Sequence, residues 1–174
     1  MPVLNLPAPT LANLAMDRAF REDIGTTAIW HYPAKEPKGK LLFIHGFRGD
    51  HHGLSATAGA LVDYEVLIPD LPGYGKTPEL KKHDLESYAD WLINLVDQIG
   101  PDVVVLGHSF GSLVVSKAVS KGLKARAIVL QNPITTRSSE QNDLANKIAR
   151  SFYSLAVSLG RVGSALLRSW LVVR

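Results

Sequence analysis

The chain has 174 residues, 46% of them hydrophobic, which is enough to bury the core of one domain and argues against disorder. It has no cysteine, which excludes disulfides and thiolate metal sites and fits a reducing compartment. The formal net charge is +3, and residues 144–174 hold five basic and no acidic residues; such a spread, without interleaved aromatic residues, favours a solvated helix face over nucleic-acid binding.

The first segments of the chain predict an arm followed by a β-hairpin. Residues 1–15 are apolar and rich in proline, and we expect them to lie on the surface as an arm. They lack the basic region and long apolar core of a signal peptide, so we expect a cytoplasmic protein. A turn at residues 24–26, followed by the strand-like run 27–32, favours a hairpin over residues 18–32.

From residue 40 onward, apolar runs typical of strands alternate with segments of helical periodicity. The expected strands are residues 40–45, 65–68, 103–106 and 125–130, and the expected helices are residues 51–62, 84–99 and 112–120. This alternation predicts an α/β fold, a doubly wound and mostly parallel sheet with helices on both faces. The functional edge of such a sheet lies at the carboxyl ends of its strands.

Three turn-rich segments follow the ends of successive strands at that edge. They are His45-Gly46-Phe47, residues 70–75, and Gly107-His108-Ser109-Phe110-Gly111. The third has the G-x-S-x-G pattern of a nucleophile elbow, a sharp strand-to-helix turn that strains Ser109 and lifts its hydroxyl clear of the sheet. Side chains two residues before or after the serine would collide, so glycine is the residue type expected there.

Together, these motifs resemble the N-terminal part of an α/β-hydrolase over about residues 27–133. The resemblance implies that residues 1–133 are the N-terminal part of the hydrolase core and that residues 134–174 begin a helical cap, both incomplete. It implies a serine hydrolase that needs no cofactor and no metal. Its site would consist of the nucleophile Ser109, the oxyanion-hole amides of Phe47 and Phe110, and the supporting residues His45, Gly46, Gly107, His108 and Gly111.

The catalytic order of that family, serine then acid then histidine, breaks off in this chain. No histidine follows His108, and the only acids after Ser109 are Glu140 and Asp143. His51 or His52 could in principle act as the base, but a helix start beside the sheet is expected to lie beyond hydrogen-bond reach, about 2.6–3.2 Å. We therefore expect the acid and the histidine to come from sequence outside this chain, which alone would be inactive or weakly active.

Two other kinds of site are disfavoured. A zinc site made by His45, His51 and His52 is not expected, because adjacent histidines seldom face one metal and no carboxylate spacing supports it. Residues 73–77 end like a phosphate-binding loop, but Asp70 stands where that motif needs a glycine.

A membrane span in the apolar stretch 152–173 is also disfavoured, because arginines interrupt it.

The predicted function is hydrolysis of an ester, thioester or amide of a small apolar acyl substrate through an acyl-Ser109 intermediate. The alternative is a protein of the same fold that binds a ligand or partner without turnover. If no strand follows residues 125–130, that strand leaves an apolar edge, through which the chain could form a homo-oligomer.

Overall fold

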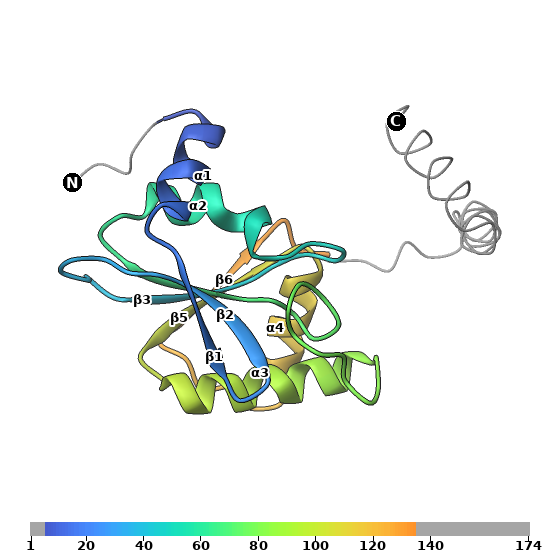
Figure 1. Ribbon diagram of the computed structural model, residues 1–174. Helices are drawn as coiled ribbons and strands as arrows, with labels where there is room; N and C mark the ends of the chain where they lie inside the picture. The colour runs from blue at the N-terminus through green and yellow to red at the C-terminus, as the bar shows by residue number, and fades with distance from the viewer. Residues whose placement is uncertain (1–5, 135–174) are drawn as a thin grey trace, which may run out of the picture. The chain divides into compact units, whose positions relative to one another are not determined.

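The computed structural model describes residues 6–134, which form one mixed sheet with helices on both sides (Figure 1). The strands are β1 (Phe20–Ile24), β2 (Thr27–Tyr32), β3 (Lys40–Ile44), β4 (Glu65–Pro69), β5 (Val103–His108) and β6 (Ala127–Gln131). The helices are α1 (Ala8–Met16), the 3-10 helix η1 (His51–Leu54), α2 (Ser55–Ala60), α3 (Leu85–Ile99) and α4 (Phe110–Ser120). The expected cap, residues 134–174, lies outside the described residues except for Ile134.

The strands lie in the order β1-β2-β4-β3-β5-β6. β1 and β2 form the predicted antiparallel hairpin, in which Ile24 pairs with Thr27, and β2 then pairs antiparallel with β4. The remaining pairs, β4–β3, β3–β5 and β5–β6, are parallel. The mostly parallel α/β sheet predicted from the sequence is therefore confirmed.

Successive residues of the central strands pack on opposite faces of the sheet. In β3, Leu42 and Ile44 belong to the apolar cluster that includes residues of α3 and α4, whereas Phe43 belongs to the cluster that includes Ala15 of α1 and Ala58 of α2. Figure 1 shows these two helix pairs on either side of the sheet. Burial on both faces is the reason why the strand reads as an unbroken apolar run, and it confirms the doubly wound arrangement.

The N-terminal segment corrects one prediction, because residues 8–16 form helix α1 and not a surface arm. Its prolines do not prevent this: Pro7 is the N-cap and Pro9 lies in the first turn, where the missing N–H has no intrahelical partner to lose. Leu11 and Ala15 are buried, and the helix packs against α2. One face of the helix therefore belongs to the core, whereas Leu14 is 41% exposed.

Two further predictions differ from the structure. The strand expected at residues 125–130 is β6, which spans Ala127–Gln131. Its apolar run is typical of a buried strand, but it is exposed along its whole length, because it is the outermost described strand on its side of the sheet. Helix α4 begins two residues earlier than expected and buries Val114, Val115 and Ala118, whereas Val119 is 45% exposed.

Within the described residues, each helix falls short of the length and apolar character needed to cross a membrane.

The packing of α1 on α2 leaves no room for a side chain at Gly59. A Cβ there would lie 1.9 Å from the Leu11 carbonyl oxygen, so Gly59→Ala should lower the free energy of unfolding by about 1–3 kcal/mol, as overpacking does. Urea denaturation measures the effect. The matched control is Gly53→Ala, where a Cβ meets nothing within 4 Å, and an equal loss in both variants would contradict this packing.

Candidate active site

The turn between β5 and α4 has the backbone of a strained elbow. Ser109 is the N-cap of α4 with φ 52° and ψ −115°, a left-handed φ that is unusual for a serine. A Cβ at Gly107 would lie 2.6 Å from the Gly111 carbonyl oxygen, and one at Gly111 would lie 2.2 Å from the Ile44 carbonyl oxygen. Both glycines are therefore required by close backbone approach.

Backbone contacts on both sides hold Ser109 in this conformation. Its N–H donates to the Gln131 carbonyl oxygen at the end of β6, over 3.0 Å. Its own carbonyl oxygen accepts from the amide of Ser112 at 2.9 Å and from the hydroxyl of Ser112 at 2.5 Å. Ser109 itself is partly exposed.

The turn after β3 lies directly beside this elbow. A Cβ at Gly46 would be 3.3 Å from the Ser109 Cβ and 3.3 Å from the His108 Nδ1, so the half-buried His108 lies against Gly46. The structure thus brings the two predicted turns together. In the described part of the chain, neither the Phe47 amide nor the Phe110 amide takes part in a hydrogen bond of a turn, loop or cap.

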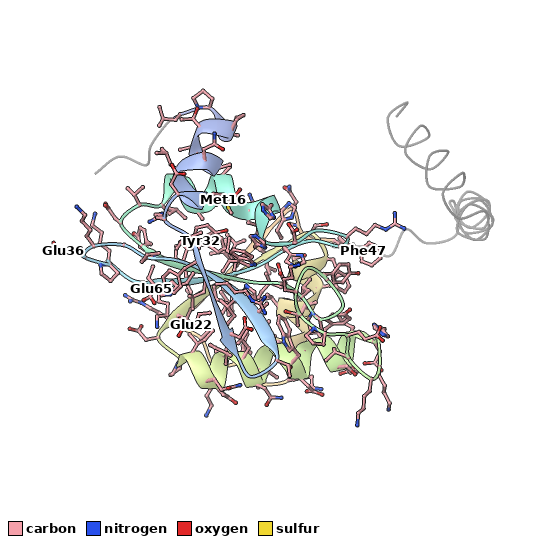
Figure 2. The ribbon with its side chains drawn as sticks, in the orientation of Figure 1. Met16, Glu22, Tyr32, Glu36, Phe47 and Glu65 are labelled. Atoms are coloured by element: carbon pink, nitrogen blue, oxygen red, sulfur yellow. The ribbon has the colours of Figure 1, made fainter. Side chains whose placement is uncertain are left out.

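The aromatic rings that follow these turns form a cluster at the same edge of the sheet. The Phe47 ring lies 5.9 Å from the rings of Phe110 and Tyr74, and Phe110 lies 5.5 Å from Tyr88, all edge to face. Phe47 is 62% exposed and extends outward from its loop (Figure 2). The cluster gives the surface around the elbow an apolar character.

His45 is buried and uses both of its ring nitrogens to fasten loops. Nδ1 donates to the Gly46 carbonyl oxygen at 2.8 Å, because Nε2 accepts from the Leu71 amide at 2.9 Å. Burial lowers the pKa of His45, which favours the neutral ring that these two bonds need. His45 therefore ties the Gly46 turn to the loop after β4 and is not available as a base.

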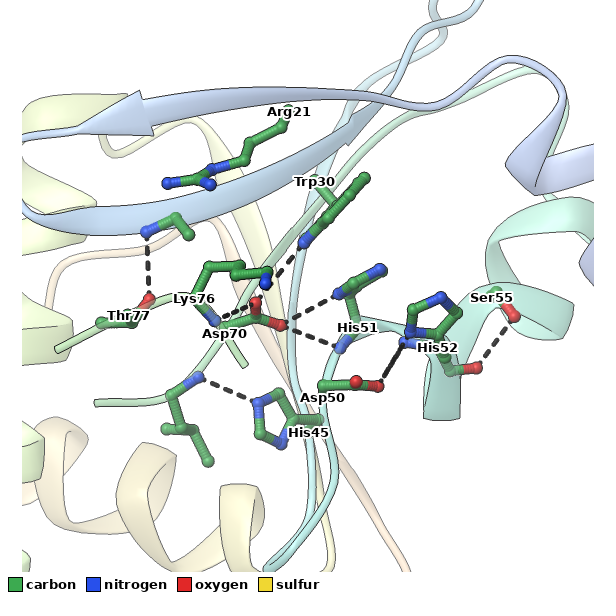
Figure 3. A network of polar contacts seen from close by, with 12 residues as sticks. Arg21, Trp30, His45, Asp50, His51, His52, Ser55, Asp70, Lys76 and Thr77 are labelled. Atoms are coloured by element: carbon green, nitrogen blue, oxygen red, sulfur yellow. Dashed lines mark hydrogen bonds and ion pairs between the residues drawn. The ribbon is translucent and has the colours of Figure 1, made fainter. Parts of the chain in front are cut away.

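The residue that joins most of these loops is Asp70, whose importance the sequence did not reveal. Its fully buried carboxylate accepts from the His51 amide at 3.1 Å, the His51 Nδ1 at 3.0 Å, the Lys76 amide at 2.9 Å and the Trp30 Nε1 at 3.4 Å (Figure 3). Burial pushes the pKa of Asp70 upward, but the hydrogen bonds from His51 and Lys76 outweigh it and lower the pKa to about 2.

His51 and His52, the two histidines considered as a base, each contact a carboxylate through Nδ1. His51 is buried, stacks on Trp30 with ring centroids 3.8 Å apart, and contacts Asp70. The His52 Nδ1 lies 3.1 Å from Asp50 Oδ1, and Asp50 is the N-cap of η1, accepting from the His52 amide. Among the described residues, no hydrogen bond joins either ring to the Ser109 hydroxyl.

The fold and these motifs define an α/β-hydrolase. Residues 41–172 match the alpha/beta hydrolase family, and the chain belongs to that family.

Two curated relatives show how much of such a protein the chain spans. It is 33% identical over 99 residues to 2-succinyl-6-hydroxy-2,4-cyclohexadiene-1-carboxylate synthase of Escherichia coli O7:K1, covering 55% of this chain and 39% of the relative. It is 30% identical over 129 residues to a probable lysophospholipase, BODYGUARD 4, of Arabidopsis thaliana, covering 68% of this chain and 30% of the relative. The chain therefore spans well under half the length of these two relatives.

Solved structures agree on the fold. A lipase-esterase related protein from Clostridium acetobutylicum superimposes with a TM-score of 0.64 at 20% identity, covering 73% of this chain and 55% of that one. A putative lipase from Acinetobacter baumannii superimposes with a TM-score of 0.60 at 19% identity, covering 88% and 55%. At these identities, the likeness concerns the fold.

The low pKa of Asp70 predicts a pH-dependent contribution to stability. Because the carboxylate is favoured in the folded state, Asp70→Asn should lower the free energy of unfolding by about 2 kcal/mol at pH 7. The difference from wild type should persist above pH about 5 and shrink as the pH falls from about 4 toward 2, since the wild-type carboxyl then becomes protonated.

Urea denaturation at several pH values measures this difference. Asp102→Asn is the control, because the Asp102 side chain is 86% exposed and its ion pair with Arg126 is long at 3.5 Å. A difference for Asp70→Asn that does not change with pH would refute the role given to its charge.

Proposed function

We propose that this chain carries the nucleophile and the oxyanion hole of a serine hydrolase that acts on an ester, thioester or amide of a small apolar acyl compound. The observation that carries the proposal is the left-handed backbone of Ser109 between two glycines that tolerate no side chain. Strain of this kind persists where the surrounding structure imposes it, and it is frequent at active sites. Membership of the alpha/beta hydrolase family supports the same conclusion.

In the proposed reaction, the Ser109 oxygen attacks the acyl carbon and forms a C–O bond, while the hydroxyl proton passes to a base. The negative oxygen of the tetrahedral intermediate accepts hydrogen bonds from the amides of Phe47 and Phe110. The intermediate collapses with loss of the alcohol, thiol or amine, which takes up the proton. Water then hydrolyses the acyl-serine and restores the hydroxyl.

The base and its acid are proposed to come from outside residues 6–134. Within that range, His45 binds two backbone groups, and His51 and His52 each contact a carboxylate. Without a base, an oxyanion hole and substrate binding still accelerate such a reaction by about 10³–10⁴ over water. The 174-residue chain is accordingly proposed to be weakly active.

An apolar substrate is favoured by the rings of Phe47, Tyr74 and Phe110 around the elbow. The name of one of the two curated relatives, a probable lysophospholipase, agrees with this proposal. The second candidate, a protein that binds an apolar ligand without turnover, is favoured by the position of the described histidines, none of which hydrogen bonds to Ser109.

Reaction with a fluorophosphonate probe tests the nucleophile. The probe should label the wild-type chain slowly, because the proposed oxyanion hole assists attack by Ser109 while the base is absent, and Ser109→Ala should abolish the labelling. Ser120→Ala, at an exposed serine on the same helix, is the matched control and should label like wild type. Mass spectrometry of the labelled peptide identifies the serine.

Turnover of a p-nitrophenyl ester distinguishes the two candidate functions. It also tests whether the base lies outside this chain. Slow hydrolysis that disappears in Ser109→Ala supports a hydrolase lacking its base. Fast multiple turnover by the 174-residue chain would refute the claim that the base lies elsewhere. Absence of both labelling and hydrolysis would favour the binding protein.

The exposed face of β6 predicts self-association of the chain. Ile128, Val129 and Leu130 are 37–44% exposed on the outermost strand of this side of the described sheet, and an apolar edge of this kind favours pairing with another copy. Val129→Lys should therefore shift the chain toward monomer. Light scattering during size-exclusion chromatography measures the mass, and a wild-type monomer that persists at high concentration would contradict the prediction.

A further inference from the structure

Asp50, His51 and His52 form a cluster at the start of η1, separate from the elbow. One ligand atom of each residue lies within 4.8 Å of the ligand atoms of the other two. The rings of His51 and His52 lie side by side, with centroids 3.9 Å apart and planes tilted by 38°. Two imidazoles and one carboxylate are thus gathered in a space that one small cation could bridge.

His51 is held in the form that binds a metal. A carboxylate can only accept hydrogen bonds, so Asp70 holds a His51 proton on Nδ1, and in the neutral ring the lone pair is then on Nε2. A carboxylate on the second ring nitrogen is the usual partner of metal-binding histidines, because it orients the ring and raises its basicity. Asp70 supplies this partner at 3.0 Å.

The His51 Nε2 is the unexplained atom of the cluster. The His51 side chain is 96% buried, and this nitrogen has no hydrogen-bond partner among the described residues. Figure 3 shows the ring nitrogen opposite Asp70 on the side of His52. A buried polar atom without a partner costs about 1–3 kcal/mol, so its presence calls for a partner that the protein itself does not provide.

The other two residues are open to solvent and already spaced like ligands. Their side chains are 40% exposed for Asp50 and 60% exposed for His52, and the Asp50 Oδ1 lies 3.1 Å from the His52 Nδ1. Two ligands bound at about 2.0–2.1 Å in a tetrahedral site lie about 3.4 Å apart. A metal can therefore replace this contact with little movement of either side chain.

We infer that Asp50, His51 and His52 bind a divalent transition ion of the Zn²⁺ type. Imidazole nitrogen with a carboxylate is a donor set that suits Zn²⁺ better than Mg²⁺ or Ca²⁺, which take oxygen ligands. Three protein ligands leave a fourth position open to water or another donor. The site differs from the zinc site excluded on sequence grounds, because His45 has no free ring nitrogen and Asp50 supplies the carboxylate.

The surroundings favour a cation on electrostatic grounds. The ionised Asp70 lies directly behind His51, so two carboxylates, Asp50 in the cluster and Asp70 beside it, offset one metal charge of +2. Trp30 stacks on the His51 ring with planes only 19° apart and fixes the ring in place. A preoriented ligand loses less conformational entropy when the metal binds.

Competition with a zinc-chelating dye tests the site on the 174-residue chain. The wild type should bind one Zn²⁺ per chain at this site. Asp50→Asn and His52→Ala should each weaken binding at least as much as loss of a histidine-orienting partner does, about 10-fold. Both variants should fold, because Asn still caps η1 and His52 is exposed; thermal unfolding of the metal-free variants checks this.

The matched control is His83→Ala. His83 is also exposed and lies 3.5 Å from the Glu79 carboxylate, but it is not part of the cluster. This variant should bind Zn²⁺ like wild type. Equal weakening in His83→Ala and His52→Ala, unchanged binding in both cluster variants, or no binding by the wild type would each overturn the inference.

Discussion

The contact that the candidate site depends on is the approach of helix α4 to the end of strand β3. A Cβ at Gly111 would lie 2.2 Å from the Ile44 carbonyl oxygen and 2.7 Å from that of His45, so only glycine allows the helix to begin there. This approach places the first turn of α4 against the Gly46 turn. Phe47, which follows β3, thereby lies at the same point of the sheet edge as Ser109 and Phe110, which follow β5.

A second set of contacts fixes the loops around that point. His45 joins the Gly46 turn to Leu71, and Asp70 joins the same loop to η1 through His51 and to its own far end through Lys76. These bonds satisfy groups that burial would otherwise leave without partners. A charged carboxylate is tolerated in the interior because donors surround it, and the loops are consequently held as one unit.

The sequence predicted what depends on local pattern. The hairpin, the alternation of strands and helices, and the two tight glycines of the elbow follow from periodicity and from steric rules that act within a few residues. Helix α1 differs from the expected arm because Pro7 lies at its N-cap and Pro9 in its first turn, where proline is compatible with a helix. The Asp70–His51 contact joins loops 19 residues apart, and no pattern in the sequence marks it. The acyl pocket and the base cannot be derived from residues 6–134.

The hydrogen bond from the Ser109 amide to the Gln131 carbonyl oxygen makes the rigidity of the elbow depend on β6. The backbone of Ser109 is hydrogen bonded to β6, the edge strand of the described sheet. Disorder of that strand would therefore also loosen the position of the serine hydroxyl. Whatever covers β6 would stiffen the elbow from a distance. The order of the Ser109 backbone therefore depends on the whole sheet. It is coupled thermodynamically to the binding of any segment or chain that packs on β6.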